Sequence, residues 1–134
     1  MKKRIWNMTE TEKIELIDDF FGYMPMIEEC LSGKIQYGID FGYLIISDYG
    51  ISPSGYMELY REIREKYGVR YAEELPWSRM DFEEIVTVMI FMSRSNRHAG
   101  NEKSSRDARI YRSMLARLEE IRKLQVLLQT FESL

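Results

Sequence analysis

The segment DFEEIVTVMIFMS, residues 81–93, contains an almost uninterrupted apolar run from Ile85 to Met92. Asp81 and Glu84 have the spacing of a capping box, in which two side chains bond to each other's backbone amides at a helix start. Apolar residues occur on nearly all sides of the helix that follows, which is typical of a buried helix. We therefore expect this helix to lie at the centre of the fold.

Further helices are predicted before this central one. Thr9 and Glu12 repeat the capping-box spacing ahead of an amphipathic run. Pro25 either kinks that helix or starts a second one, which continues to Gly33. Ser52-Pro53 is a helix-start signal for a tyrosine-rich helix that ends at Gly68. Residues 69–80 look irregular, with Leu75, Pro76 and Trp77 at the edge of the core.

The stretch KIQYGIDFGYLIIS, residues 34–47, has a different period. Its odd-numbered positions from Ile35 to Ile45 are apolar or aromatic, and such alternation predicts strands. We expect an antiparallel hairpin that turns near Asp40-Phe41-Gly42. The predicted fold class is therefore α+β, with four to five helices packed on a short antiparallel β-hairpin. Residues 1–134 are expected to form a single domain.

The last predicted helix begins near Ser104, which has Asp107 at capping-box spacing. It would run for up to about 28 residues, or roughly 42 Å, which exceeds the diameter of so small a domain. The apolar side chains near its end either fold back onto the core or meet another subunit. We favour a homodimer, because a second copy offers the same surface in return. The expected interface residues are Leu124, Leu127, Leu128 and Phe131.

Composition is that of a globular protein, with 45% hydrophobic and 31% charged residues. The single cysteine, Cys30, excludes an internal disulfide and fits a reducing compartment. The first residues, MKKR, begin like a signal peptide, but no apolar run follows them. No segment approaches the roughly 20 apolar residues of a membrane span. We expect a cytoplasmic protein without membrane contact.

Charge is distributed unevenly along the chain, although the formal net charge is only −3. Residues 1–93 hold 10 Lys or Arg and 17 Asp or Glu, whereas residues 94–134 hold 9 and 5. Such asymmetry indicates either an anionic partner or self-complementary association. Alternatively, the acidic helices and the basic helix neutralise each other within one fold.

The segment SRSNRHAGNEKSSRDAR, residues 93–109, concentrates guanidinium groups between the central helix and the last one. Its first two arginines follow a predicted helix end, where positive charge stabilises the helix dipole. The other two, together with Arg112, are three residues apart and form one stripe on the last helix. The candidate anion-binding or partner-binding residues are Arg94, Arg97, His98, Arg106, Arg109 and Arg112.

Three interpretations of this arginine segment stay open. The side chains pair with the acidic helices, or they contact an anionic protein or nucleic-acid surface. In the third, they capture a small phosphorylated ligand or nucleotide, helped by the free amides at Ser104-Ser105 and by a stacking Tyr or Trp.

Catalysis and metal binding have weaker support in the sequence. His98 could serve as a general base for Ser93, Ser95 or Ser104, but no recognised spacing supports this. One histidine and one cysteine are too few for a structural zinc site. Four acidic residues of the first helix could hold Mg²⁺, namely Glu12, Glu15, Asp18 and Asp19. Carboxylates near a helix start more often balance the helix dipole. The tripeptide Asp40-Phe41-Gly42 lacks the other motifs of a kinase. We expect no cofactor and no metal.

The order of elements resembles a family of bacterial and phage proteins known as domain of unknown function 6508. Its Arg-x-x-Arg-Phe-x-x-Gly segment is matched by Arg94, Arg97 and Gly100, although His98 stands at the aromatic position and the glycine comes one residue early. Its Leu-x-Arg-Leu motif is matched within MLARL by Leu115, Arg117 and Leu118. The resemblance covers roughly residues 10–120 and implies a similar architecture, but no activity.

These patterns together favour a non-enzymatic binding or regulatory accessory protein of bacterial or phage origin. It would contact a macromolecular partner, a protein or a nucleic acid, through its charged surface, and an anti-defence inhibitor would fit this description. The alternative function is binding of a small phosphorylated ligand or nucleotide through the arginine segment.

Overall fold

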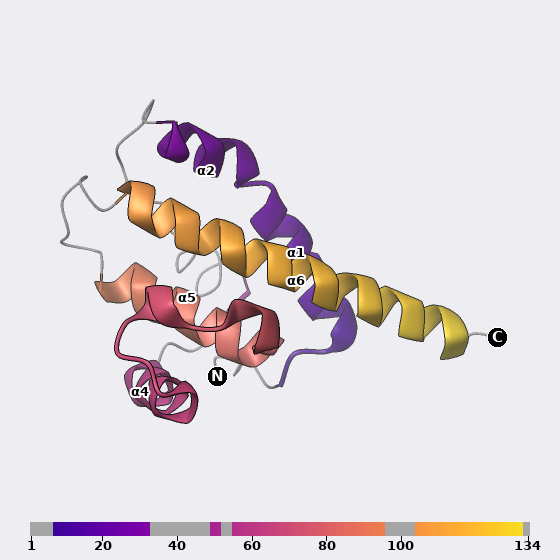
Figure 1. Ribbon diagram of the computed structural model, residues 1–134. Coiled ribbons are helices and arrows are strands. Elements are labelled where there is room, and N and C mark those ends of the chain that lie inside the picture. Colours follow the sequence, from indigo (N-terminus) through magenta and orange to yellow (C-terminus); the bar gives the residue numbers. More distant parts are fainter. Residues whose placement is uncertain (1–6, 33–48, 52–54, 96–103, 133–134) are drawn as a thin grey trace.

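The computed structural model describes residues 7–32, 49–51, 55–95 and 104–132. The described residues form five α-helices, with two short 3-10 helices between the third and the fourth of them (Figure 1). In chain order the elements are α1 (Glu10–Phe21), α2 (Met24–Leu31), α4 (Tyr56–Tyr67), η3 (Ala72–Glu74), η4 (Trp77–Arg79), α5 (Phe82–Ser95) and α6 (Ser104–Glu132).

The predicted α+β fold class is wrong. All elements in the described ranges are helices, and no β-strand occurs there; Ile51 alone has the backbone pairing of an isolated β-bridge. The stretch for which the hairpin was predicted, residues 34–47, lies outside the described residues. The physical reason for the correction is that helices supply most of the described core: α4 and α6 pack on α5, and α1, α2 and η4 pack on α6.

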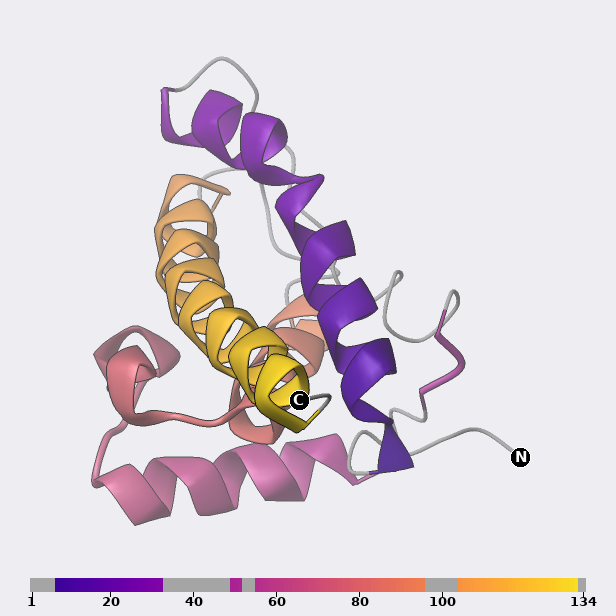
Figure 2. The same ribbon diagram turned by 90° about the vertical axis from the view of Figure 1, so that its right-hand side faces the viewer.

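The central position predicted for α5 is confirmed. Its apolar side chains are shielded on one side by α4 and on the other by α6. Figure 2 shows α4 crossing the molecule below α5, with α1 and α6 side by side above it. The fully buried side chains of α5 include Ile85, Val86, Val88, Met89 and Ile90.

Both capping boxes predicted ahead of α1 and α5 are present. The amide of Glu12 donates to Thr9 Oγ1 at 3.1 Å, and the amide of Thr9 donates to Glu12 Oε1 at 2.9 Å. At α5 the corresponding distances between Asp81 and Glu84 are 2.8 and 3.1 Å. Local sequence therefore fixes where these two helices begin.

Other helix ends follow from proline and glycine. Pro25 lies in the first turn of α2, so it starts a second helix rather than bending α1. Helix α4 begins at Tyr56 behind Gly55, which has φ 82°, whereas the predicted start at Ser52-Pro53 lies outside the described residues. Gly68 ends α4 as predicted, in the left-handed conformation with φ 66°.

Helix α6 spans 29 residues, close to the predicted length. Its first half is deeply packed, with Tyr111, Met114, Leu115 and Leu118 at most 1% exposed. Its last turns extend beyond the other helices (Figure 1). Within the described ranges, no helix is both long and apolar enough to cross a membrane.

Candidate binding surfaces

The outer face of α6 carries the part of the predicted arginine site that the structure describes. Arg109 and Arg112 are both exposed on this helix. Arg109 is nine positions before Leu118, or two and a half helical turns, so the two side chains leave α6 on opposite sides. Leu118 faces the core, and Arg109 therefore faces away from it.

The remaining predicted site residues cannot be placed beside these two. Arg94 lies in α5 and Arg106 lies in α6, but the structure does not describe their side chains. Arg97 and His98 lie outside them entirely, so the predicted cluster of six is represented by Arg109 and Arg112 alone.

The later arginines of α6 have fixed partners. Arg117 Nε donates to the carbonyl oxygen of Met80 at 2.9 Å, and its guanidinium lies 3.1 Å from Glu120. Arg122 pairs with Glu119 at 3.0 Å. By contrast, neither Arg109 nor Arg112 forms an ion pair with another described residue.

The acidic first helix finds its partners elsewhere. Asp18 of α1 lies 3.4 Å from Arg122, and Asp19 accepts a hydrogen bond from the hydroxyl of Tyr49. Glu10 of α1 lies 3.4 Å from Lys13, and none of these three described contacts uses Arg109 or Arg112. Mutual neutralisation between α1 and α6 exists, but it involves a different arginine from the predicted stripe.

A small hollow lies next to Arg109. It has a volume of about 170 Å³ and is lined by Glu73, Trp77, Arg109, Ile110 and Ser113. The indole of Trp77 is half-buried there, at the edge of the core as predicted. The hollow thus combines an aromatic ring, a guanidinium and a hydroxyl with the carboxylate of Glu73. The guanidinium suits an anionic group, whereas the carboxylate would repel one.

Sequence reasoning did not connect Trp77 or Ser113 with a specific arginine. The signal for Ser113 was available, because it stands four residues after Arg109 and shares its helix face. No local signal joins Trp77 to this face, since packing of η4 on α6 brings them together.

A second hollow lies where α1, α5 and α6 meet. Its volume is about 160 Å³, and its apolar lining comes from Ile14, Ile17, Phe82 and Ile121. Lys13 at its rim is only 17% exposed and pairs with Glu83 of α5 at 3.0 Å. Burial by itself lowers the pKa of Lys13, but the hydrogen bond and charge of Glu83 outweigh it and the pKa is raised. Lys13 is therefore firmly charged. We call this second hollow the α1–α6 hollow.

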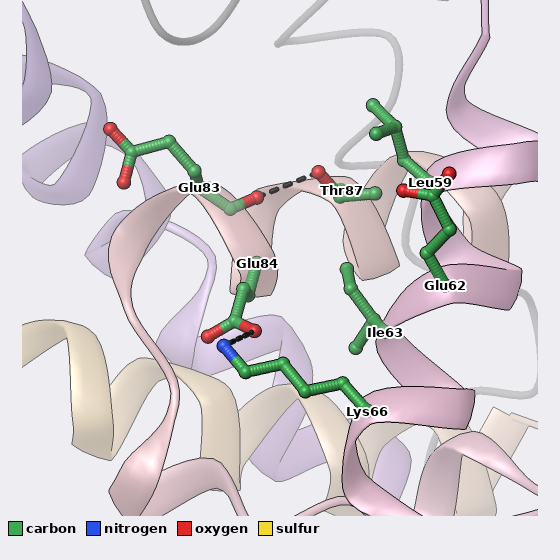
Figure 3. A pocket seen from close by; sticks show the side chains of 7 residues that line it. All are labelled: Leu59, Glu62, Ile63, Lys66, Glu83, Glu84 and Thr87. Atoms are coloured by element: carbon green, nitrogen blue, oxygen red, sulfur yellow. Dashed lines mark hydrogen bonds and ion pairs between the residues drawn. The ribbon is translucent and has the colours of Figure 1, made fainter.

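A third cavity, of about 230 Å³, lies between α4 and α5 (Figure 3). Leu59 and Ile63 form its apolar side, Thr87 lies in its lining, and the charged residues Glu62, Lys66, Glu83 and Glu84 line the rest. Glu84 there accepts hydrogen bonds from Lys66 at 3.0 Å and from the hydroxyl of Tyr67 at 2.8 Å. Burial favours a higher pKa for Glu84, but the Asp81 amide, Lys66 and Tyr67 together hold the pKa below its usual value. This cavity contains none of the predicted site residues.

The end of α6 exposes a ridge of large apolar side chains. Leu124 is 56% exposed and Phe131 is 62% exposed. Leu127 is nine positions after Leu118, so it also points away from the core-facing side of α6. The apolar ridge consists of Leu124, Leu127, Leu128 and Phe131, the four residues predicted to form an oligomer interface.

Three of the four acidic residues considered for magnesium have other partners in the structure. Glu12 closes the capping box of α1, and Asp18 and Asp19 have the partners given above. In the parts of the chain that are described, no three His, Cys, Asp or Glu side chains are grouped as metal ligands. Cys30 is buried, and burial raises the pKa of its thiol, with a further contribution from Glu29.

Comparison with protein families, with curated proteins and with solved structures found no match to this chain.

Proposed function

We propose that this protein is a non-enzymatic binding protein that contacts an anionic surface of a macromolecular partner through Arg109 and Arg112. The observation that carries the proposal is the pairing pattern on α6. Arg117 and Arg122 have partners that hold the fold together, whereas Arg109 and Arg112 are exposed and pair with no other described residue.

Two exposed guanidinium groups one turn apart suit recognition of carboxylates, because each offers a fork of donors. The overall acidity of the chain, with a formal net charge of −3, favours a protein partner over duplex DNA. A cytoplasmic accessory protein of bacterial or phage origin fits this description. An anti-defence inhibitor is one such protein, since it needs only a charged and shape-specific surface.

A charge-reversal experiment tests the proposal. The double variant Arg109→Glu/Arg112→Glu should lose the partner that the wild-type protein captures from its native host. The matched control is Arg61→Glu/Arg70→Glu, which reverses two exposed arginines elsewhere on the molecule. Equal capture by both double variants would contradict the assigned surface.

The second candidate function is binding of a small phosphorylated ligand or nucleotide. The hollow that joins Trp77 to Arg109 favours it, because a base could stack on the indole while a phosphate meets the guanidinium on the side away from the Glu73 carboxylate. The chain has two tryptophans, so Trp6→Phe leaves Trp77 as the only indole reporter. Addition of nucleotides should then quench the Trp77 fluorescence and raise the melting temperature, and Arg109→Ala should abolish both effects.

A further inference from the structure

We infer that the apolar ridge of α6 binds a second copy of this chain in antiparallel orientation, with Phe131 of each copy entering the α1–α6 hollow of the other. The inference goes beyond the proposed function, because it concerns the second half of α6 and not the arginines of the first half.

The ridge and the hollow lie along one side of the same helix. Ile121, Leu124, Leu128 and Phe131 are separated by three, four and three positions, which places them in one stripe along α6. Ile121 lines the hollow at one end of this stripe, and Phe131 is the exposed side chain at the other. A surface that carries both a projection and a matching recess can pair with itself.

Antiparallel pairing makes every layer of this stripe apolar. If two α6 helices run in opposite directions, Ile121 faces Phe131 of the second copy and Leu124 faces its Leu128. Because the dimer has a twofold axis, each of these two contacts occurs twice, and the seam contains four apolar layers.

Parallel pairing is less favourable for a charge reason. In a parallel arrangement each residue meets its own counterpart, so Arg117 at the rim of the hollow would face a second Arg117. Parallel α6 helices would also bring the remaining helices of the two copies, the helical bodies, to the same end of the dimer. Antiparallel helices keep the bodies at opposite ends, because α6 extends beyond the other helices (Figure 1).

The size of the hollow and the apolar part of its lining fit an aromatic ring. A cavity of about 150 Å³ lined by apolar side chains is large enough to hold benzene. The α1–α6 hollow measures about 160 Å³, and Ile14, Ile17, Phe82 and Ile121 form the apolar part of its lining. The rest of the lining is charged or polar and consists of Glu10, Lys13, Asp81, Glu83, Arg117 and Gln125. Phe131 and Met57 are the most exposed large hydrophobic side chains of the described residues, at 62% each. Transfer of Phe131 into the hollow would remove its apolar surface from water.

The first test is the molar mass in solution, measured by light scattering and sedimentation over a wide range of concentration. We expect a monomer–dimer equilibrium for the full chain. Leu128→Glu should weaken the association by at least about thirtyfold, because a charge would be buried in the seam. Gln129→Glu is the matched control, since it adds the same charge one position away on the opposite side of the stripe, and it should leave the association unchanged.

The role of the hollow has its own variants. Phe131→Ala should weaken the dimer without affecting folding of the monomer, because Phe131 is already 62% exposed. Ile14→Trp should weaken it as well, by filling the hollow from α1. If the full chain stays monomeric at all concentrations, or if Phe131→Ala dimerises with wild-type affinity, the inference is wrong.

Cysteine cross-linking tests the orientation. In a Cys30→Ser background, Leu124→Cys and Leu128→Cys chains should form a disulfide with each other when mixed. Predominant Leu124→Cys pairs with themselves would instead indicate the parallel dimer and overturn the antiparallel arrangement. Arg109→Glu/Arg112→Glu should dimerise normally, so failure of the proposed function and failure of this inference can be told apart.

Discussion

Arg122 of α6 lies 3.4 Å from Asp18 of α1, and this ion pair joins the two helices that the uneven charge distribution had suggested would pair. The arginines predicted to form a binding stripe are not the ones used. Arg109 stands outside this contact and is exposed, so the charge of α6 is divided between a structural part and an outward-facing part.

Removal of the structural pair should have a small effect. The side chain of Arg122 is 32% exposed and that of Asp18 is 55% exposed, so solvent screens the attraction. We expect Arg122→Ala to lower the free energy of unfolding by less than about 1 kcal/mol and to leave partner capture intact. Urea denaturation and the capture experiment check the two halves of this prediction. Loss of capture in Arg122→Ala would mean that the binding surface extends further along α6.

Glu84 should matter more, because it joins the start of α5 to the end of α4. We expect Glu84→Ala to lower the free energy of unfolding by about 1–3 kcal/mol, since it removes the acceptor for Tyr67, Lys66 and the Asp81 amide.

The effect of Glu84 should also depend on pH. The surrounding donors outweigh burial and lower the pKa of Glu84 in the folded state, so its stabilisation is fully present above the ordinary value of 4.5. It is lost as the pH falls through the lower folded-state pKa. Thermal melts of wild type and Glu84→Ala should therefore differ at pH 7 and converge in strong acid. A difference that grows on acidification would contradict this assignment.

Two leucines on α6 should differ strongly in how much stability they lose on the same substitution. Leu118 is fully buried, and Leu118→Ala should cost about 2–5 kcal/mol through lost contacts and a cavity. Leu124 is 56% exposed, and Leu124→Ala should change the stability of the monomer by no more than about 0.5 kcal/mol. Chemical denaturation at low protein concentration compares them. A large cost for Leu124→Ala under those conditions would place Leu124 inside its own chain's core.

Gly68 should be sensitive through its backbone alone. Its φ is 66°, and apart from Gly68 itself and its two chain neighbours no described atom outside the backbone of α4 lies within 4 Å of the position that a Cβ would take. We expect Gly68→Ala to cost about 1–2 kcal/mol, because L-residues are strained in the left-handed region. Gly68→Asn should cost less, since asparagine tolerates this conformation at helix ends. Equal melting temperatures for the two variants would argue against a conformational cause.

Much of the helical organisation could be predicted from the sequence, because its signals are local. The capping boxes at Thr9 and Asp81 and the glycine at the end of α4 involve residues within one turn of each other. The burial of α5 could also be predicted, since an apolar residue on every side leaves no face for water.

The fold class could not be predicted in this way. Alternating apolar residues in 34–47 predicted strands, yet the described core is closed by helices packed on one another. Alternation describes one segment by itself, whereas the fold class depends on which faces of separate elements cover each other.

The candidate surfaces also include features set by local sequence and features set by the packing of helices. The sequence by itself determined the outer face of α6, because helical geometry alone sets Arg109 and Leu127 on the side opposite Leu118. Only the tertiary structure decided that Arg122 pairs with α1, that Trp77 shares a hollow with Arg109, and that Ile121 lines a recess with Phe82. The physical reason is that these contacts join residues far apart in the chain, and their geometry is set by the packing of whole helices and not by the spacing of neighbours.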